Sequence, residues 1–235
     1  MLAINRRTLI GAAALAASLF AVSAFAEDAH PYFKGDAVPL LDLLPPPPAP
    51  DSAQTKAELE EVISLMKSAT EERKKLAIAD DEENVVAFLS GMGVKLSKEQ
   101  IPLTYALIQR VVDTEDEITT PAKKGFGRKR PPLVNDQIKP LIELSKSGAY
   151  PSGHGTNGTA TGLVLIKMLP EKKVELFARI KEYSWSRMIV GVHYRSDLDA
   201  AYTAGALLAQ AVAQNAEFQK DFEPAKAELR KAMGM

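Results

Sequence analysis

The chain has 235 residues, of which 46% are hydrophobic and 25% charged, a composition that supports a buried core and argues against global disorder. The formal net charge of −1 argues against a general nucleic-acid-binding protein. Because the chain contains no cysteine, disulfides, cysteine-based zinc sites and a cysteine nucleophile are excluded.

Residues 1–26 have the organisation of an export signal. A basic start at Arg6-Arg7 is followed by an apolar stretch over 9–22 and by small residues at a cleavage site, Ala24-Phe25-Ala26. The apolar stretch is too short for a comfortable membrane span. We expect export by the general secretory or the twin-arginine route, cleavage of the signal, and a periplasmic mature protein with no stable membrane anchor.

Residues 27–50 are predicted to form an extended, proline-rich lead-in. The run Pro45-Pro46-Pro47-Pro48, followed by Pro50, cannot be helical and favours a polyproline conformation. The functional alternative is a docking motif for a proline-reading domain, and the simpler interpretation is a segment packed along the domain. We expect residues 51–235 to form that domain.

Downstream of Asp51 the apolar residues recur at helical spacing and rarely alternate with polar ones, so strand signals are weak. Capping-box patterns and a Thr-Pro pair mark several helix starts. The sequence therefore predicts an all-α, single-domain bundle of about eight helices. In chain order the expected helices are Thr55–Ala69, Asp80–Leu89, Ser97–Val111, one beginning at Thr120-Pro121, Gly158–Leu169, Pro170–Val190, Leu198–Ala213 and Phe218–Met233.

The block Pro151-Ser152-Gly153-His154 stands just before a small-residue run that we expect to be helical. The N-terminus of a helix presents free backbone N–H groups and a partial positive charge, which together bind anions. Gly153 lets a ligand come close to the backbone, and the Ser152 hydroxyl can donate to it. The block predicts an anion site beside His154, although Pro-Ser-Gly alone would suit an ordinary turn and helix cap.

His193 and Asp197 are four residues apart, a spacing that puts both side chains on one face of a helix or tight turn. The aspartate can then accept a hydrogen bond from one imidazole nitrogen and leave the other with a lone pair for nucleophilic attack. By itself Asp197 could instead be an N-cap of the following helix, with Ser196 as a rival cap. Arg187, on the preceding helix, could grip phosphate oxygens or be solvated.

Lys123 and Arg130 belong to a basic stretch, 123–130, which a solvated loop or a patch for anionic surfaces would also explain. Pro131-Pro132 fixes the backbone after Arg130 and can aim that side chain inward. Together the three blocks supply three cations, two histidines and one carboxylate, the inventory for moving a phosphoryl group onto histidine. Three cations can neutralise the phosphoryl charge, so we expect neither a metal nor another cofactor.

The order and spacing of these blocks resemble the signature of the PAP2-type acid phosphatase superfamily, which also includes vanadium haloperoxidases and membrane lipid phosphatases. Within it the chain looks like the bacterial class A non-specific acid phosphatases, most strongly from Lys123 to Ala201. The segments that carry this closer likeness are Leu44–Pro48, Ala149–His154 and Ser186–Ala201. The chain departs from the family at Gly155, where Thr is usual, at Pro132, where an aromatic residue is typical, and in lacking a frequent cysteine pair.

The resemblance implies a role for each residue of the three blocks. His193 would be the nucleophile that forms a phosphohistidine, and Asp197 would orient it. His154 would protonate the leaving alkoxide and then activate water. The residues that would bind the phosphoryl oxygens are Lys123, Arg130, Ser152, Gly153 and Arg187.

The resemblance therefore implies a periplasmic acid phosphatase of broad specificity that hydrolyses phosphomonoesters, with phosphotransferase side activity. One alternative is a phosphatase for lipid-linked phosphate, against which the lack of a long apolar span after the signal argues. Another is a vanadate-dependent haloperoxidase, although those enzymes are usually much larger. A non-enzymatic anion-binding protein is the third, and the intact His193–Asp197 pair argues against it. The expected partners are small phosphorylated substrates and further copies of the chain in a homo-oligomer, with no nucleic acid.

Overall fold

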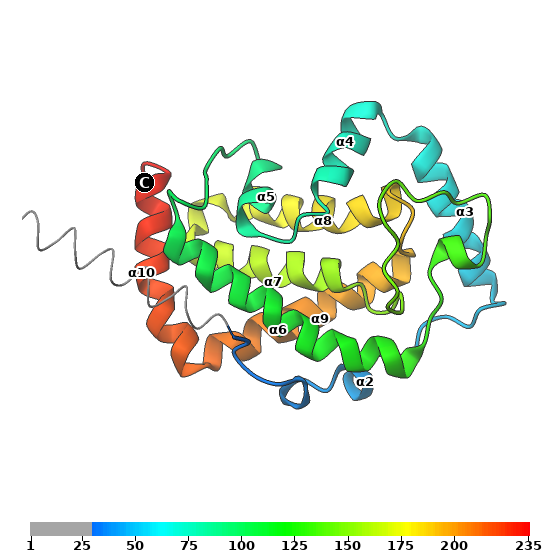
Figure 1. Cartoon of the computed structure of the whole chain (residues 1–235), viewed down its shortest axis with the longest axis horizontal. Coiled ribbons are helices and arrows are strands. Elements are labelled where there is room, and N and C mark those ends of the chain that lie inside the picture. Colours follow the sequence, from blue (N-terminus) through cyan, green and yellow to red (C-terminus); the bar gives the residue numbers. More distant parts are fainter. Residues whose placement is uncertain (1–29) are drawn as a thin grey trace, which may run out of the picture.

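Three helices form the centre of the fold: α7 (Gly153–Met168), α8 (Lys173–Ile189) and α9 (Arg195–Gln214). The computed structural model describes residues 30–235, so the predicted signal segment lies outside the described residues. Within residues 30–235, α7 packs extensively against both α8 and α9 (Figure 1). Every regular element of this range is helical, which confirms the all-α prediction.

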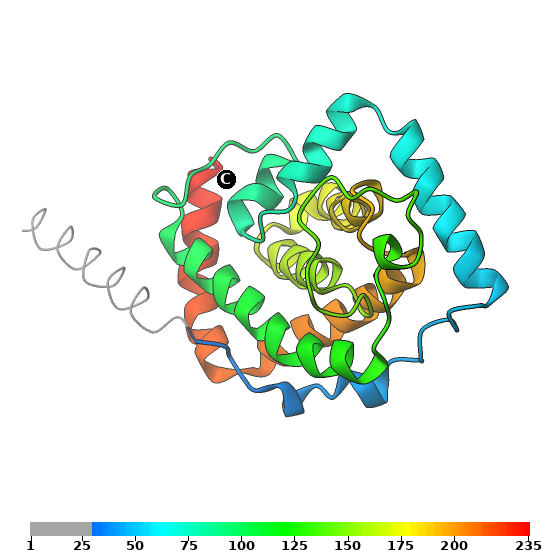
Figure 2. The same ribbon diagram turned by 45° about the vertical axis from the view of Figure 1, so that its right-hand side comes forward.

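The outer helices surround this centre, as the turned view in Figure 2 shows with α7 and α8 seen nearly end-on. Helix α6 packs against α7 and α10, and helices α3 and α4 pack against α8. The described part of the chain has nine α-helices, close to the eight expected. The outer helices are α3 (Ala53–Ser68), α4 (Glu71–Ala79), α5 (Val85–Ser90), α6 (Pro102–Phe126) and α10 (Ala216–Ala232).

Helix α7 can occupy the centre because its glycines let neighbouring helices come close. A Cβ atom at Gly158 would lie 2.3 Å from the ring of Tyr183 on α8. At Gly155, a Cβ would lie 2.9 Å from the Cβ of Ala201 on α9. Both distances are shorter than carbon atoms tolerate. Gly155 therefore allows the close approach of α9.

The lead-in over residues 30–50 packs along α6. It contains a 3-10 turn, Gly35–Ala37, and the short helix α2 (Leu40–Leu43), before a helix-free stretch over the proline run. The hydroxyl of Tyr150 donates to the Pro45 carbonyl at 2.8 Å, and Leu40 is buried in the main core. The lead-in thus contributes to the same hydrophobic core as α6 to α10.

The helix start predicted at Thr120-Pro121 is wrong. Thr120-Pro121 does not begin a helix, because α6 runs without a break from Pro102 to Phe126 and contains Pro121. A proline inside a helix removes one N–H donor, here the one that would reach the carbonyl of Glu117. That carbonyl oxygen instead lies against Gly35 of the lead-in, only 2.2 Å from where a Cβ would be. Packing along α6 therefore overrides the local signal.

The starts of the first helices also differ from the prediction. Ser52, not Thr55, caps α3 by accepting the Thr55 N–H. Asn84, not Asp80, caps α5, and α4 was not predicted. The start predicted at Ser97 is wrong too, because α6 begins only at Pro102, and the Gln100 side chain instead accepts the Ser97 N–H within a turn. Asp80 follows the last residue of α4, where its carboxylate pairs with a buried arginine.

That arginine is Arg179 on α8, and its pair with Asp80 fixes the segment between α4 and α5. Both side chains are almost fully buried. Arg179 donates from Nη2 to Asp80 Oδ1 at 2.5 Å and from Nη1 to Oδ2 at 3.2 Å. The Ser186 hydroxyl donates to the same carboxylate at 2.6 Å. Because this segment also carries Asp81 and Glu83, the pair holds two carboxylates that face the site described below.

Replacing Arg179 tests this constraint. Arg179→Met leaves the Asp80 carboxylate buried and without its charged partner, so we expect the free energy of unfolding to fall by ~3–5 kcal/mol. Urea unfolding at neutral pH measures the change. Arg230→Met, which breaks the exposed ion pair with Glu171, is the matched control and should change the stability far less. Equal losses in the two variants would contradict the structural importance of the buried pair.

Candidate active site

Four helix ends meet around one cavity: the C-terminal ends of α6 and α8 and the N-terminal ends of α7 and α9. The cavity has a volume of about 210 Å³. Helix N-termini carry partial positive charge and C-termini partial negative charge, so the four helix ends largely offset one another. An anion is favoured instead by Lys123, Arg130 and Arg187 in the lining, together with the N-terminus of α7 at Gly153. The residues that line the cavity are Asp81, Glu83, Glu115, Asp116, Lys123, Arg130, Ile142, Glu143, Ser145, Ser147, Gly153, His154, Arg187, Val192 and His193.

His193 has one ring nitrogen held by a carboxylate and the other facing a guanidinium. Its Nδ1 lies 3.1 Å from Asp197 Oδ2, and its Nε2 lies 3.0 Å from Nη1 of Arg130. A guanidinium has no acceptor atom, so Nε2 must accept from Arg130. The ring proton is therefore at Nδ1, donated to Asp197, and the lone pair is at Nε2. This is the protonation state that a nucleophilic histidine requires.

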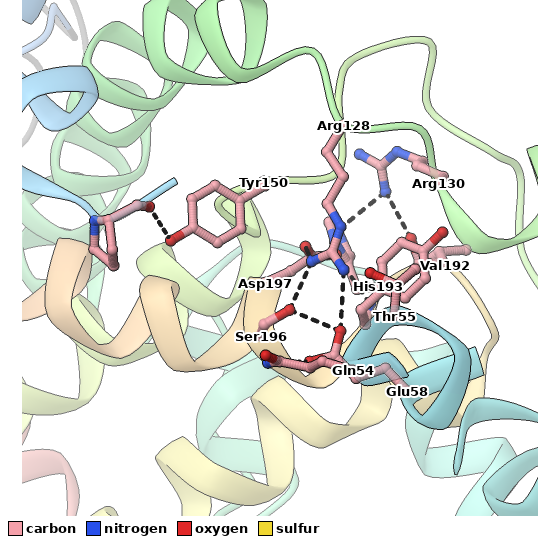
Figure 3. Close-up of polar contacts among 12 residues, drawn as sticks. Gln54, Thr55, Glu58, Arg128, Arg130, Tyr150, Val192, His193, Ser196 and Asp197 are labelled. Atoms are coloured by element: carbon pink, nitrogen blue, oxygen red, sulfur yellow. Dashed lines mark hydrogen bonds and ion pairs between the residues drawn. The ribbon is translucent and has the colours of Figure 1, made fainter. Parts of the chain in front are cut away.

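Asp197 is fully buried and is the acceptor of several donors (Figure 3). Besides His193, the backbone N–H of Tyr194 donates to Oδ2 at 2.9 Å, and Arg128 Nη1 donates to Oδ1 at 2.6 Å. Arg128 continues to Glu58 on α3 at 3.0 Å. Asp197 therefore binds His193 and also satisfies a backbone N–H at the start of α9, so the two interpretations of this residue hold together.

His154 also pairs with a carboxylate. Its Nδ1 donates to Glu83 Oε1 at 2.9 Å, and its ring stacks on Tyr183 with the centroids 4.0 Å apart. Nε2 is buried and has no hydrogen-bond partner among the described residues, while the side chain lines the cavity. The two histidines thus have matching arrangements, each with Nδ1 held by a carboxylate and Nε2 available to other groups.

The three predicted cations all line the cavity and are all buried. Arg187 donates to Asp81 Oδ1 and to the Ala77 carbonyl, both at 2.7 Å, and its buried Nε has no partner among the described residues. Lys123 lies in the last turn of α6, which ends at Gly127 in the left-handed conformation. The solvated-loop interpretation of these residues is therefore wrong.

Two of the predicted site residues do not line the cavity. Asp197 lies behind His193, where its Oδ2 contacts the imidazole Nδ1. Ser152 is fully buried, and its hydroxyl accepts the N–H of Gly155 at 3.2 Å as the N-cap of α7. Gly153, the first residue of α7, does line the cavity. The structure thus brings Gly153 to the cavity and places the Ser152 side chain behind it.

The environment lowers the pKa of both histidines. Burial, then the charges of Arg130 and Lys123, hold the pKa of His193 well below its ordinary value of 6.5. Burial and Arg187 also lower the pKa of His154, but Glu83 acts in the opposite direction. His193 is therefore neutral in the empty site, and His154 is the histidine whose protonated form is stabilised by a neighbour.

Several residues that contact or neighbour the predicted site residues were not predicted, among them Glu83, Glu115 and Arg128. Arg128 stood in the basic stretch with nothing to distinguish it from its neighbours, and Glu83 ends an acidic run, 80–83. Glu115 has an i, i+8 spacing to Lys123 on one helix, which would have placed the two on related faces. No group of three or more possible ligands able to hold a metal ion occurs among the residues that the structure describes.

Comparison with known proteins agrees with this geometry. A sequence profile for the PAP2 superfamily matches residues 102–220. An acid phosphatase from Zymomonas mobilis is 32% identical over 223 residues, which cover 90% of this chain and 83% of the relative. Non-specific acid phosphatases from Providencia stuartii and Salmonella typhimurium are also 32% identical, covering 83% and 79% of this chain and 82% and 78% of the relatives.

Two solved structures share the fold. A bacterial vanadium-dependent iodoperoxidase matches 77% of this chain with a TM-score of 0.58 and 20% identity, and the match spans about half, 53%, of that longer chain. A transmembrane PAP2-type phosphatidylglycerolphosphate phosphatase from Bacillus subtilis matches 74% of this chain and 89% of its own length, with a TM-score of 0.50 and 18% identity. At such low identity these likenesses show the fold alone.

The chain therefore belongs to the PAP2 superfamily. Within that superfamily it is a hydrolase of the acid phosphatase type, as its three sequence blocks predicted. None of the helices described over residues 30–235 combines the length and the apolar character needed to cross a bilayer.

The protonation state of His193 can be measured directly. In the ligand-free enzyme at about pH 6, we expect a neutral ring with the proton on Nδ1, because its pKa lies well below the ordinary value. Nitrogen-15 NMR of the histidine rings, with His193→Gln to assign the signal, distinguishes the two tautomers and the imidazolium. A His193 that gains its second proton at pH 6.5 or above, or that carries its proton on Nε2, would contradict the site geometry.

Proposed function

We propose that this acid phosphatase is a periplasmic enzyme that hydrolyses small phosphomonoesters in two steps, through a phosphohistidine at His193. One observation carries the proposal: the Nε2 lone pair of His193 faces a cavity lined by Lys123, Arg130 and Arg187. Phosphoryl transfer depends mainly on neutralising charge and on aligning the nucleophile with the leaving group. These three cations and the His193 lone pair supply both requirements.

In the first step the phosphoryl oxygens bind the three cations and the backbone N–H of Gly153. Arg130 turns from His193 Nε2 to a phosphoryl oxygen, which frees the lone pair. Nε2 then attacks phosphorus, the P–N bond forms, and the bond between phosphorus and the ester oxygen breaks. His154 Nε2 donates its proton to the departing alkoxide, so an alcohol leaves. Asp197 stabilises the positive charge that develops on the His193 ring.

In the second step the neutral His154 accepts a proton from a water molecule, whose oxygen attacks phosphorus. The P–N bond breaks, inorganic phosphate forms, and His193 regains its lone pair. An alcohol that replaces the water would receive the phosphoryl group instead, which gives the enzyme a phosphotransferase side activity. No step requires a metal ion.

The location and substrate class rest on separate observations. Residues 1–26 have the pattern of an export signal, which supports a periplasmic location. The cavity of about 210 Å³ suits a phosphoryl group and a small part of its ester. The phosphatidylglycerolphosphate phosphatase and the iodoperoxidase share only the fold, so small phosphomonoesters are preferred to a lipid-linked phosphate or a peroxidase reaction.

A substrate panel tests this function. Purified protein beginning at Glu27 should release phosphate from aryl and alkyl monoesters more efficiently than from phosphatidylglycerolphosphate in detergent, and without added metal. His193→Ala should abolish turnover while vanadate binding, measured by calorimetry, is partly retained because the three cations remain. Full activity of His193→Ala would end the proposal. If the protein oxidised iodide, with vanadate and peroxide present, faster than it released phosphate, the haloperoxidase hypothesis would be favoured instead.

The pairing of His154 with Glu83 predicts how the rate depends on the leaving group. Without a general acid, the reaction of poor leaving groups slows most, so His154→Ala should lose ~10²–10⁴-fold in rate on alkyl phosphates and much less on an activated aryl phosphate.

The same pairing predicts a shift in the pH profile. Glu83→Gln removes a carboxylate that raises the pKa of His154, so the basic limb of the kcat/KM profile should move to lower pH. Glu82→Gln, at the exposed neighbouring position, is the control.

Two results would contradict this assignment. Equal losses on alkyl and aryl esters in His154→Ala would mean that His154 only shapes the cavity. An unchanged basic limb in Glu83→Gln would mean that the carboxylate has a structural role alone.

A further inference from the structure

Glu115 is a buried carboxyl group inside the cavity with no part in the two-step reaction described above. It lies on α6, it is only 2% exposed, and it lines the cavity with the three cations. Its Oε1 atom is buried and has no hydrogen-bond partner among the described residues. Burying a polar atom without a hydrogen-bond partner costs free energy of folding, so this oxygen is a candidate to bind a ligand.

The position of Glu115 places that oxygen at the phosphoryl group. A Cβ atom added to Gly153 would lie 2.4 Å from Lys123 Nζ and 2.8 Å from Glu115 Oε1. The ammonium and the carboxyl group therefore both face the first residue of α7. The N–H of that residue is a proposed ligand of the phosphoryl oxygens, so an anion bound there and to Lys123 comes within reach of Glu115.

The charge of Glu115 decides whether this contact is attractive. An ionised carboxylate beside a phosphoryl group would repel it, because two anions would share a site with little water. A protonated carboxyl group would instead donate a hydrogen bond to a phosphoryl oxygen. Protonation satisfies the unpartnered carboxyl group and removes the repulsion in the same event.

The surroundings of Glu115 favour protonation. Burial raises the pKa of Glu115 to about 7. Lys123 and the Thr119 hydroxyl act against this rise, and Glu83 and Asp116 act with it. Glu83 comes from the segment between α4 and α5, and the other three residues from α6 itself. The remaining charged or titratable groups that line the cavity are Asp81, Arg130, Glu143, His154, Arg187 and His193.

We propose that Glu115 binds the phosphoryl group as a neutral carboxylic acid that donates its proton to a phosphoryl oxygen, so that anion binding is coupled to uptake of a proton. This inference rests on the proposed function, because its ligand is the phosphoryl group in the same cavity. No covalent bond forms or breaks at Glu115, and the proton comes from solvent. The residue adds a pH-dependent donor to the three permanent cations.

The coupling gives a defined dependence of affinity on pH. Below the pKa of free Glu115 the carboxyl group is already protonated, and the affinity for a dianion is constant with respect to this group. Above it, binding must draw a proton from solution, and the affinity falls by up to about tenfold for each pH unit. The affinity for the anion is therefore higher at acidic pH, and this effect on binding is separate from the titration of the two histidines.

Sulfate is a suitable probe because, unlike phosphate, it keeps its charge across the useful range. We would measure its competitive inhibition constant from about pH 5 to about pH 8.5. In the unmodified enzyme the constant should rise about tenfold more over this range than in Glu115→Gln. The glutamine keeps the shape and a donor N–H but cannot take up a proton. Asp116→Asn, which removes the adjacent exposed carboxylate, is the matched control. It should move the rise to slightly lower pH, because Asp116 raises the pKa of Glu115, but the rise should keep its full size, because Glu115 can still take up a proton.

The outcomes separate this inference from the proposed function. If sulfate competes with substrate but the pH dependence of its inhibition is the same in Glu115→Gln and in the unmodified enzyme, the inference is overturned and the phosphate site stands. An equal change in Asp116→Asn would attribute the effect to general charge and overturn it as well. If sulfate does not compete with substrate, the phosphate site itself is contradicted.

A second measurement needs no variant. Infrared difference spectra of the unmodified enzyme above pH 7, with and without sulfate, should show the carbonyl stretch of a protonated carboxylic acid appearing as the anion binds. Ionised carboxylates lack this band. Its absence would overturn the proposal even if Glu115→Gln did not fold.

Discussion

The arrangement of the site depends on the hydrogen bonds that the buried carboxylate of Asp197 accepts. This carboxylate holds His193, the backbone at the start of α9, and Arg128 from the loop after α6. The backbone carbonyl of Asp197 accepts the N–H of Ser152, the N-cap of α7, at 3.1 Å. Through Arg128 the carboxylate reaches Glu58 on α3. Full burial raises the pKa of Asp197 to about 7, and Arg128 and the Tyr194 N–H limit that rise. These donors therefore favour the ionised form, which accepts the hydrogen bond from the imidazole.

The second constraint is the concentration of positive charge around the cavity. Three buried cations repel one another, and the ligand-free protein balances them with its own groups. Arg187 forms an ion pair with Asp81, and Arg130 donates a hydrogen bond to Nε2 of His193. In the proposed mechanism, a phosphoryl group replaces some of these contacts with stronger ones to its own oxygens. The carboxylates near the cations would then neutralise charge in the empty site and make the occupied site sensitive to pH.

The sequence predicted the parts of the site that are encoded locally, and it failed where distant segments meet. The four-residue spacing of His193 and Asp197 and the cap before His154 need no knowledge of the fold. Arg128 and Glu83 could not be recognised, because Asp197 lies 69 residues beyond Arg128 and His154 lies 71 beyond Glu83. For the fold, apolar spacing placed the central helices well. The Thr120-Pro121 signal misled because packing of the lead-in along α6 outweighs one lost hydrogen bond.

The central claim is that His193 accepts the phosphoryl group, and isolating the covalent intermediate tests it most directly. The enzyme would be mixed with a fast-reacting aryl phosphate and denatured in alkali within one turnover, since phosphohistidine is stable to base and labile to acid. Mass spectrometry of the peptides should then place one phosphoryl group on His193, lost on brief acid treatment. A phosphoryl group on any other residue, or none at a time when one equivalent of alcohol has been released, would contradict the account.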